Sequence, residues 1–102
     1  MERLSKLIKS VESIDKEQKA LILPLLSQIV YHEEQMDYLK TLPQIKVHKD
    51  DPTKQKATPA AKLYKEHSQT YISLVRTVLS VMAKAEPSAV DELMKRLEEF
   101  KV

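Results

Sequence analysis

Histidines are the side chains of this chain best suited to acid–base or metal chemistry, and two of the three fall on apolar stripes. His32 and His67 follow the heptad spacing of two long helix-like segments, whereas His48 lies in a polar stretch and is expected to be exposed. If the two segments pack side by side, His32 and His67 come close together. A structural zinc site needs four protein ligands and a catalytic one three, and this pair supplies two. We therefore favour a packed, hydrogen-bonded pair over a metal site, and expect no cofactor.

Paired carboxylates recur along the chain, but their spacing is wrong for acid–base catalysis. Adjacent residues on a helix point in different directions, so sequence neighbours do not form a dyad. The pairs are Glu33-Glu34, Asp50-Asp51, Asp91-Glu92 and Glu98-Glu99. We interpret them as solvated surface charges. The chain has no glycine and no cysteine, which excludes glycine-rich phosphate loops and thiolate chemistry, so we do not expect an enzyme.

The strongest remaining signal is a cluster of lysines in the middle of the chain. From Lys40 to Lys65, seven lysines against two aspartates give a balance of +5, which leaves −3 for the rest of a chain of net charge +2. Lysine neutralises phosphates but lacks the planar fork with which arginine reads bases. Salt-sensitive contact with the DNA backbone is one interpretation, and a solvated lysine-rich loop is the other. The candidate DNA-binding residues are Lys46, Lys49, Lys54, Lys56 and Lys62.

Apolar residues at three- and four-residue steps predict two helices before this cluster, over residues 2–12 and 15–42. Asp15 has the spacing of an N-cap for the second helix. Pro24 lies inside that helix, where it removes a backbone hydrogen bond at a cost of about 3 kcal/mol. Either the helix is continuous and kinked, or it begins near Leu23. We favour the continuous helix.

A polar, proline-marked loop is expected over residues 43–57. Ile45 and Val47 alternate there as in an extended chain, but the run is too short to predict a strand. Thr58 followed by Pro59 indicates the start of a helix, because threonine caps the first turn and proline fits the first helical position. The helices expected beyond the loop span residues 58–84 and 87–101.

The two long segments carry matched apolar seams and should pack as an antiparallel pair. We predict one all-α domain over residues 1–102, a long helical hairpin with the polar basic loop at one end. The short N- and C-terminal helices are expected to pack at the end away from the loop. A chain of 102 residues can bury one modest core, and no apolar run reaches the roughly 20 residues of a membrane span.

Two sets of apolar side chains are candidates for contacts with other chains. Tyr31 and Tyr38 are seven residues apart on a face other than the seam, which fits either half-burial or contact with a neighbouring subunit. The last helix has an apolar stripe that serves either the core of its own chain or the docking of a partner. That stripe consists of Val90, Leu93, Met94, Leu97 and Phe100.

The run VHKDDPTKQKATPAAKLYKEHSQTYISLVRTVLSVM, which begins at Val47, resembles the central part of phage terminase small subunits of the short class called P-twenty-seven. The matching features are the Asp51-Pro52 step, the Thr58-Pro59-Ala60 helix start and the tyrosine-bearing helix from Tyr64. With the preceding helix, the resemblance covers residues 14–85. The family often has glycine in the extended connection, and this chain has none.

The resemblance implies a non-enzymatic DNA-binding and assembly subunit of a phage DNA-packaging motor. Subunits of this kind bind viral DNA, form homo-oligomers and pass the DNA to the large terminase subunit, an ATPase and nuclease. The resemblance also implies a location in the host cell cytoplasm, with no catalytic residue, metal or cofactor. The alternative is a helical-hairpin protein–protein interaction module, a phage or host adaptor, that binds no nucleic acid.

Overall fold

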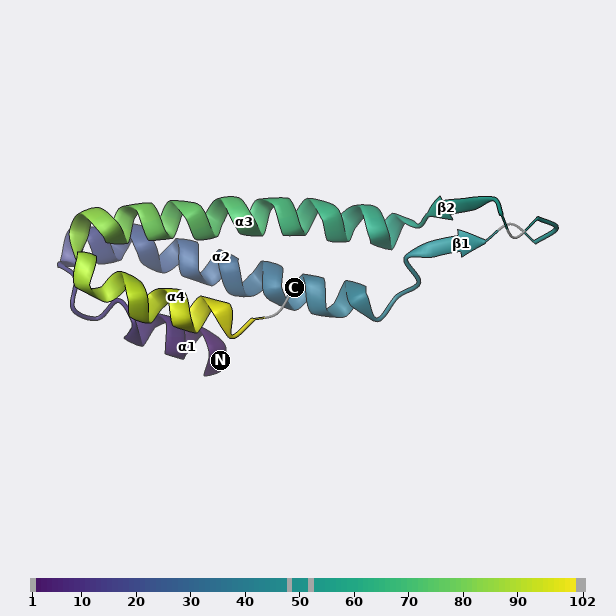
Figure 1. Cartoon of the computed structure of the whole chain (residues 1–102). Coiled ribbons are helices and arrows are strands. Elements are labelled where there is room, and N and C mark those ends of the chain that lie inside the picture. Colours follow the sequence, from purple (N-terminus) through teal and green to yellow (C-terminus); the bar gives the residue numbers. More distant parts are fainter. Residues whose placement is uncertain (1, 48, 52, 101–102) are drawn as a thin grey trace.

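The structure is a computed structural model that describes residues 2–47, 49–51 and 53–100. Its elements in chain order are α1 (Glu2–Lys9), α2 (Lys16–Lys40), β1 (Ile45–Val47), β2 (Gln55–Ala57), α3 (Pro59–Ala85), the 3₁₀ turn η1 (Pro87–Ala89) and α4 (Val90–Glu98). The long helices α2 and α3 lie side by side, with α1 and α4 along one flank (Figure 1). The predicted all-α class with two long helices packed together is confirmed. His48 lies outside the described residues.

Side-chain caps define where the two long helices begin. The Asp15 carboxylate accepts the N–H of Gln18 at 2.9 Å, and the Thr58 hydroxyl accepts the N–H of Ala61 at 3.1 Å. Each bond satisfies one of the N–H groups that the first turn of a helix leaves unpaired. Pro59 follows in the first turn, where its missing N–H costs nothing. Both predicted N-caps are confirmed.

α2 continues through Pro24 as one helix of 25 residues, so the alternative start near Leu23 is not adopted. Packing along the length of α2 offsets the hydrogen bond that proline removes. The terminal helices are shorter than predicted. α1 ends at Lys9 because the chain turns over residues 10–13, and the last predicted helix is divided into η1 and α4.

The hydrophobic core lies where α1 and α4 cover α2 and α3. Ile22, Ile29 and Met36 of α2 repeat every seven residues and are fully buried in one cluster with Val78 and Met82 of α3. The N-terminal segment and α4 add Leu7, Val11, Leu93 and Leu97 to this cluster. The terminal helices therefore provide the apolar layer that two helices alone would lack.

Burial on α2 is displaced to one side of the predicted seam. His32, expected in the seam, is half-buried, as is Leu25, whereas Leu26, Val30 and Glu33 are buried. The displacement follows from the position of α1 and α4, which cover one flank of the long helices (Figure 1). The period of the seam was predicted correctly, but the side that α1 and α4 cover was not.

The predicted polar loop over residues 43–57 contains a short β-ribbon, which corrects that prediction. β1 and β2 pair antiparallel, with Ile45 opposite Ala57, Lys46 opposite Lys56 and Val47 opposite Gln55. The N–H of Thr58 donates to the Gln44 carbonyl at 3.2 Å and continues the pairing to the start of α3. The ribbon extends from one end of the long helices in a molecule 61 Å long (Figure 1).

Candidate nucleic-acid interface

Lysines occupy one face of the ribbon. Side chains alternate along a strand, so Lys46 and Lys56 project from one face while Ile45, Val47 and Ala57 project from the other. All five residues are exposed. Lys46 and Lys56 are direct cross-strand neighbours, and like charges in that position repel each other. An anion bound close to both ammonium groups would remove this repulsion.

The ribbon lysines share one concave surface, which we call the lysine hollow. It has a volume of about 690 Å³ and is lined by Lys46, Lys49, Lys54 and Lys56 together with Val47, Thr53 and Gln55. No acidic residue is among these lining residues. Four ammonium groups around one hollow create a strongly positive potential. The structure thus brings together four of the five predicted DNA-binding lysines, whereas the exposed Lys62 of α3 does not line the hollow.

Asp51 shapes the connection between the two strands. Its Oδ1 accepts the Thr53 hydroxyl at 2.7 Å and the Thr53 N–H at 3.1 Å, and its carbonyl accepts the N–H of Lys54 at 3.0 Å. The bond from the Thr53 hydroxyl, followed by that from its N–H, lowers the pKa of the Asp51 carboxyl because both stabilise the charged form. The carboxylate is exposed, as predicted, and it has in addition a turn-forming role that was not predicted.

His32 of α2 and His67 of α3 meet across the long helices, as predicted. Their Nδ1 atoms are 2.8 Å apart and their ring centroids 5.0 Å apart. This is a hydrogen bond in which one Nδ1 carries the proton and the other accepts it. Burial, and then the charge of His67, lowers the pKa of His32 below its ordinary value. The Tyr31 ring contacts both imidazoles edge-on.

Within the described ranges, no group of three or more histidine, cysteine, aspartate or glutamate side chains is placed to hold a metal ion. In the same part of the chain, no helix combines the length and the apolar character needed to cross a bilayer. The hydrogen bond between His32 and His67 is a contact between α2 and α3.

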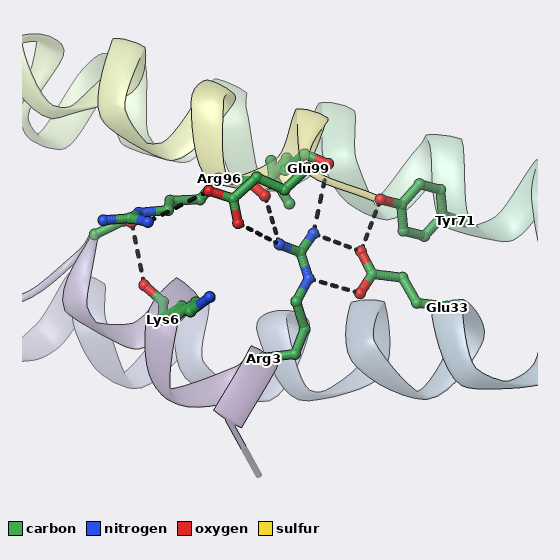
Figure 2. Close-up of polar contacts among 8 residues, drawn as sticks. Arg3, Lys6, Glu33, Tyr71, Arg96 and Glu99 are labelled. Carbon is green, nitrogen blue, oxygen red and sulfur yellow. Dashed lines mark hydrogen bonds and ion pairs between the residues drawn. The ribbon is translucent and has the colours of Figure 1, made fainter. Parts of the chain in front are cut away.

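A buried ionic cluster that the sequence analysis did not find joins four helices (Figure 2). The Arg3 guanidinium donates from Nε to Glu33 Oε1 and from Nη2 to Glu33 Oε2, both at 2.9 Å. Arg3 Nη1 donates to the backbone carbonyl of Arg96, and the Tyr71 hydroxyl donates to Glu33 Oε2 at 2.9 Å. One carboxylate thus links α1, α2 and α3, and the arginine extends the link to α4.

Glu33 is 3% exposed, so its predicted place on the solvated surface was wrong. Burial, followed by the charge of Glu33, raises the pKa of Tyr71 well above its ordinary value. The hydrogen bond to Glu33 raises the pKa of Arg3 further. Arg3 therefore stays cationic and Tyr71 neutral, which suits a structural cluster and not proton transfer. The available signal was spacing, since Glu33 lies seven residues after Leu26 on the stripe that becomes buried.

Tyr31 and Tyr38, predicted to be half-buried or in contact with another subunit, are exposed on the surface of α2. Their exposed fractions are 52% and 61%, so neither ring belongs to the core of this chain. Large aromatic side chains at this level of exposure contribute much of the energy of protein interfaces when a partner covers them. Contact with another chain remains the prediction for both residues.

Most of the apolar stripe on α4 serves the core of its own chain. Leu93 and Leu97 are buried there, and Val90 and Phe100 pack against the same cluster. These four residues therefore fit the alternative in which the last helix packs against the core of its own chain. Met94 is 40% exposed and lines an apolar groove of about 330 Å³ between α3 and α4. Within the stripe, Met94 is the side chain presented most openly to a partner.

No protein-family model, curated protein or solved structure matches the chain.

Proposed function

We propose that this chain is a non-enzymatic DNA-binding and assembly subunit of a phage DNA-packaging terminase, which contacts the DNA backbone and the large ATPase and nuclease subunit. The lysine hollow is the observation that supports DNA binding, because four exposed lysines line it and no acidic residue is among its lining residues. The similarity of residues 14–85 to small terminase subunits supports the biological setting. In that setting the chain forms homo-oligomers and acts in the host cell cytoplasm.

In this proposal the chain works as a long antiparallel helical hairpin, with α1 and α4 packed at the end away from the ribbon. The burial of Leu7 and Leu93 in one cluster with Ile22 and Met82 supports that arrangement, since Ile22 and Met82 lie in the halves of α2 and α3 away from the ribbon. The basic ribbon and the acidic-leaning terminal end then occupy opposite ends of a molecule 61 Å long. DNA and protein partners can contact such a molecule at the same time without competing for one surface.

The lysines would act through phosphate neutralisation, which releases condensed counterions from DNA. Each phosphate contact contributes a slope of about −0.9 to the dependence of log K on log salt concentration. The four lysines of the lysine hollow therefore predict a slope of about −3 to −4 for duplex DNA. Affinity should vary little with base sequence, because ammonium groups cannot form the bidentate base contacts of arginine.

A charge-reversal variant tests this proposal. Lys49→Glu, Lys54→Glu and Lys56→Glu together should abolish DNA binding in a gel shift at moderate salt, with the helical circular dichroism unchanged. The matched control reverses three exposed lysines away from the ribbon, Lys16, Lys84 and Lys95, with the same change in net charge. Equal loss in both variants would show that only net charge matters. Undiminished binding by the ribbon variant would remove the lysine hollow from the mechanism.

A helical-hairpin interaction module that binds no nucleic acid is the second candidate. The exposed Tyr31 and Tyr38 rings and the groove beside Met94 favour it, because each offers an apolar surface to a protein. This candidate predicts no gel shift with duplex DNA even at low salt. Light scattering on the same sample gives the oligomeric state, and changing both tyrosines to serine should reduce self-association if these rings form a subunit contact.

A further inference from the structure

We propose that the ribbon docks in the major groove of B-form duplex DNA, with Lys46 and Lys56 reaching phosphates on opposite walls of the groove. This inference rests on the DNA binding proposed above and adds to it the form of nucleic acid and the mode of contact. Its basis is the pairing of β1 with β2, which places two lysines side by side on one face of a free-standing ribbon.

The dimensions of the ribbon select the major groove. Two paired strands lie about 4.8 Å apart, and their backbones and side chains add several ångströms on each side. The major groove is about 12 Å wide and admits a two-stranded ribbon, whereas the minor groove is about 6 Å wide. The ribbon also projects beyond the ends of α2 and α3, so the helices do not obstruct its approach to a groove (Figure 1).

The charges on the ribbon match the two walls of such a groove. Lys46 and Lys56 start from directly opposed positions, and each ammonium ends a flexible four-carbon stem. Mutual repulsion directs the two ammonium groups apart, one toward each row of phosphates. Lys49 and Lys54 line the same hollow nearer the tip and extend the positive surface along the groove.

Only one of the two faces of the ribbon is expected to contact the DNA. The lysine face turns toward the DNA, and the face with Ile45 and Ala57 turns away from it. From Lys40 to Lys65 the chain contains no arginine, so this segment lacks the guanidinium fork that most often reads guanine. The proposed lysine contacts go to phosphates, which carry no sequence information, so duplexes of different sequence should bind with similar affinity.

The form of the nucleic acid gives the first test. Duplex RNA carries the same backbone charge, but its major groove is deep and too narrow for protein side chains to read, and single-stranded DNA has no groove. Fluorescence anisotropy at one moderate salt concentration should show duplex DNA bound at least about tenfold more tightly than duplex RNA or single-stranded DNA of the same sequence. Equal affinity for all three would overturn groove docking and leave backbone binding intact. No binding to any of them at low salt would overturn both.

Groove blocking gives the second test. Duplex DNA with bulky glucosyl groups on its cytosines, which project into the major groove, should bind more weakly than unmodified DNA of equal length. Saturation of an A·T-rich duplex with distamycin, a minor-groove ligand, should leave the affinity unchanged. The reverse pattern, with displacement by distamycin and tolerance of glucosyl groups, would overturn the major-groove assignment.

Paired variants of the two ribbon faces complete the experiment. Lys46→Gln with Lys56→Gln should weaken duplex DNA binding by roughly tenfold at moderate salt and lower the salt slope by about 2. Ile45→Thr, on the other face and outside the lysine hollow, keeps a β-branched side chain in β1 and should leave the affinity unchanged. A larger loss in the threonine variant than in the glutamine variant would show that the other face meets the DNA, and the proposed orientation would be wrong.

Discussion

Arg3 of α1 and Glu33 of α2 form a bidentate ion pair, with Nε to Oε1 and Nη2 to Oε2 both at 2.9 Å. The Glu33 side chain is 4% exposed and the Arg3 side chain 23% exposed. The Glu33 carboxylate has the Arg3 guanidinium as its partner only when α1 is packed against α2. The docking of α1 therefore depends on one carboxylate of α2, that of Glu33.

Glu33→Gln should destabilise the fold by about 2–3 kcal/mol. Removing one partner of a buried ion pair costs roughly 3–5 kcal/mol, and the partial exposure of Arg3 relieves part of that cost. Urea unfolding followed by circular dichroism measures the change. Glu34→Gln, on the exposed neighbouring position, is the matched control and should stay within about 0.5 kcal/mol of wild type. Equal effects of the two changes would mean that the ion pair contributes nothing.

Tyr71→Phe should cost about 1 kcal/mol, because it removes the hydroxyl that donates to Glu33 Oε2 at 2.9 Å. The ring remains to fill the core, where Tyr71 is 6% exposed. The same change in the Glu33→Gln background should cost less, since the charged acceptor is already gone. Tyr64→Phe, at a half-buried position one heptad earlier, is the control. Strict additivity of the Tyr71 and Glu33 changes would contradict this account of the cluster.

The His32–His67 pair predicts a stability that falls on acidification. The pKa of His32 is lowered in the folded protein, so the unfolded chain binds the proton more readily. The free energy of unfolding should therefore be constant well above pH 6.5, the ordinary pKa of histidine, and should fall as the pH drops through and below that value. Urea midpoints at several pH values measure this effect.

His32→Gln should flatten this pH dependence, because it removes the group whose pKa is lowered, whereas His67→Gln should only reduce it, because burial of His32 is the larger cause of the lowered pKa. Glutamine keeps a polar side chain that can donate to and accept from the remaining imidazole. A variant with both histidines changed should show no step in this pH range beyond that of surface groups. An unchanged step in the double variant would place the titrating group elsewhere in the molecule.

Thr58→Ala should destabilise the junction between the ribbon and α3 by about 1–2 kcal/mol. The hydroxyl caps α3 through the N–H of Ala61 and also donates to the Pro43 carbonyl at 2.6 Å, so it anchors both strands of the connection. Thr77→Ala is the matched control, since that exposed hydroxyl only bonds back to Ser73 within α3. Hydrogen exchange should show faster opening of the ribbon amides in the Thr58 variant alone.

Local features of this fold were predictable from the sequence because they depend on residues close together in the chain. Asp15 and Thr58 cap helices through N–H groups three residues away. The seven-residue repeat of Ile22, Ile29 and Met36 determines which stripe of α2 turns inward. The same repeat in both long helices places His32 and His67 on stripes that face each other once the two helices pack side by side. The lysines were identified from composition alone.

The tertiary structure decided which flank of the long helices is covered and how the lysines are arranged. Glu33 becomes buried because Arg3, thirty residues away, docks on it with α1. No local pattern specifies that contact. The pairing of Lys46 with Lys56 likewise depends on two strands of three residues, too short to be predicted from their alternation but held together by hydrogen bonds between them. The positive charge of this segment can be counted from the sequence. The gathering of four lysines around one hollow depends on the reversal of the chain, because the pairing of β1 with β2 determines which side chains share a face.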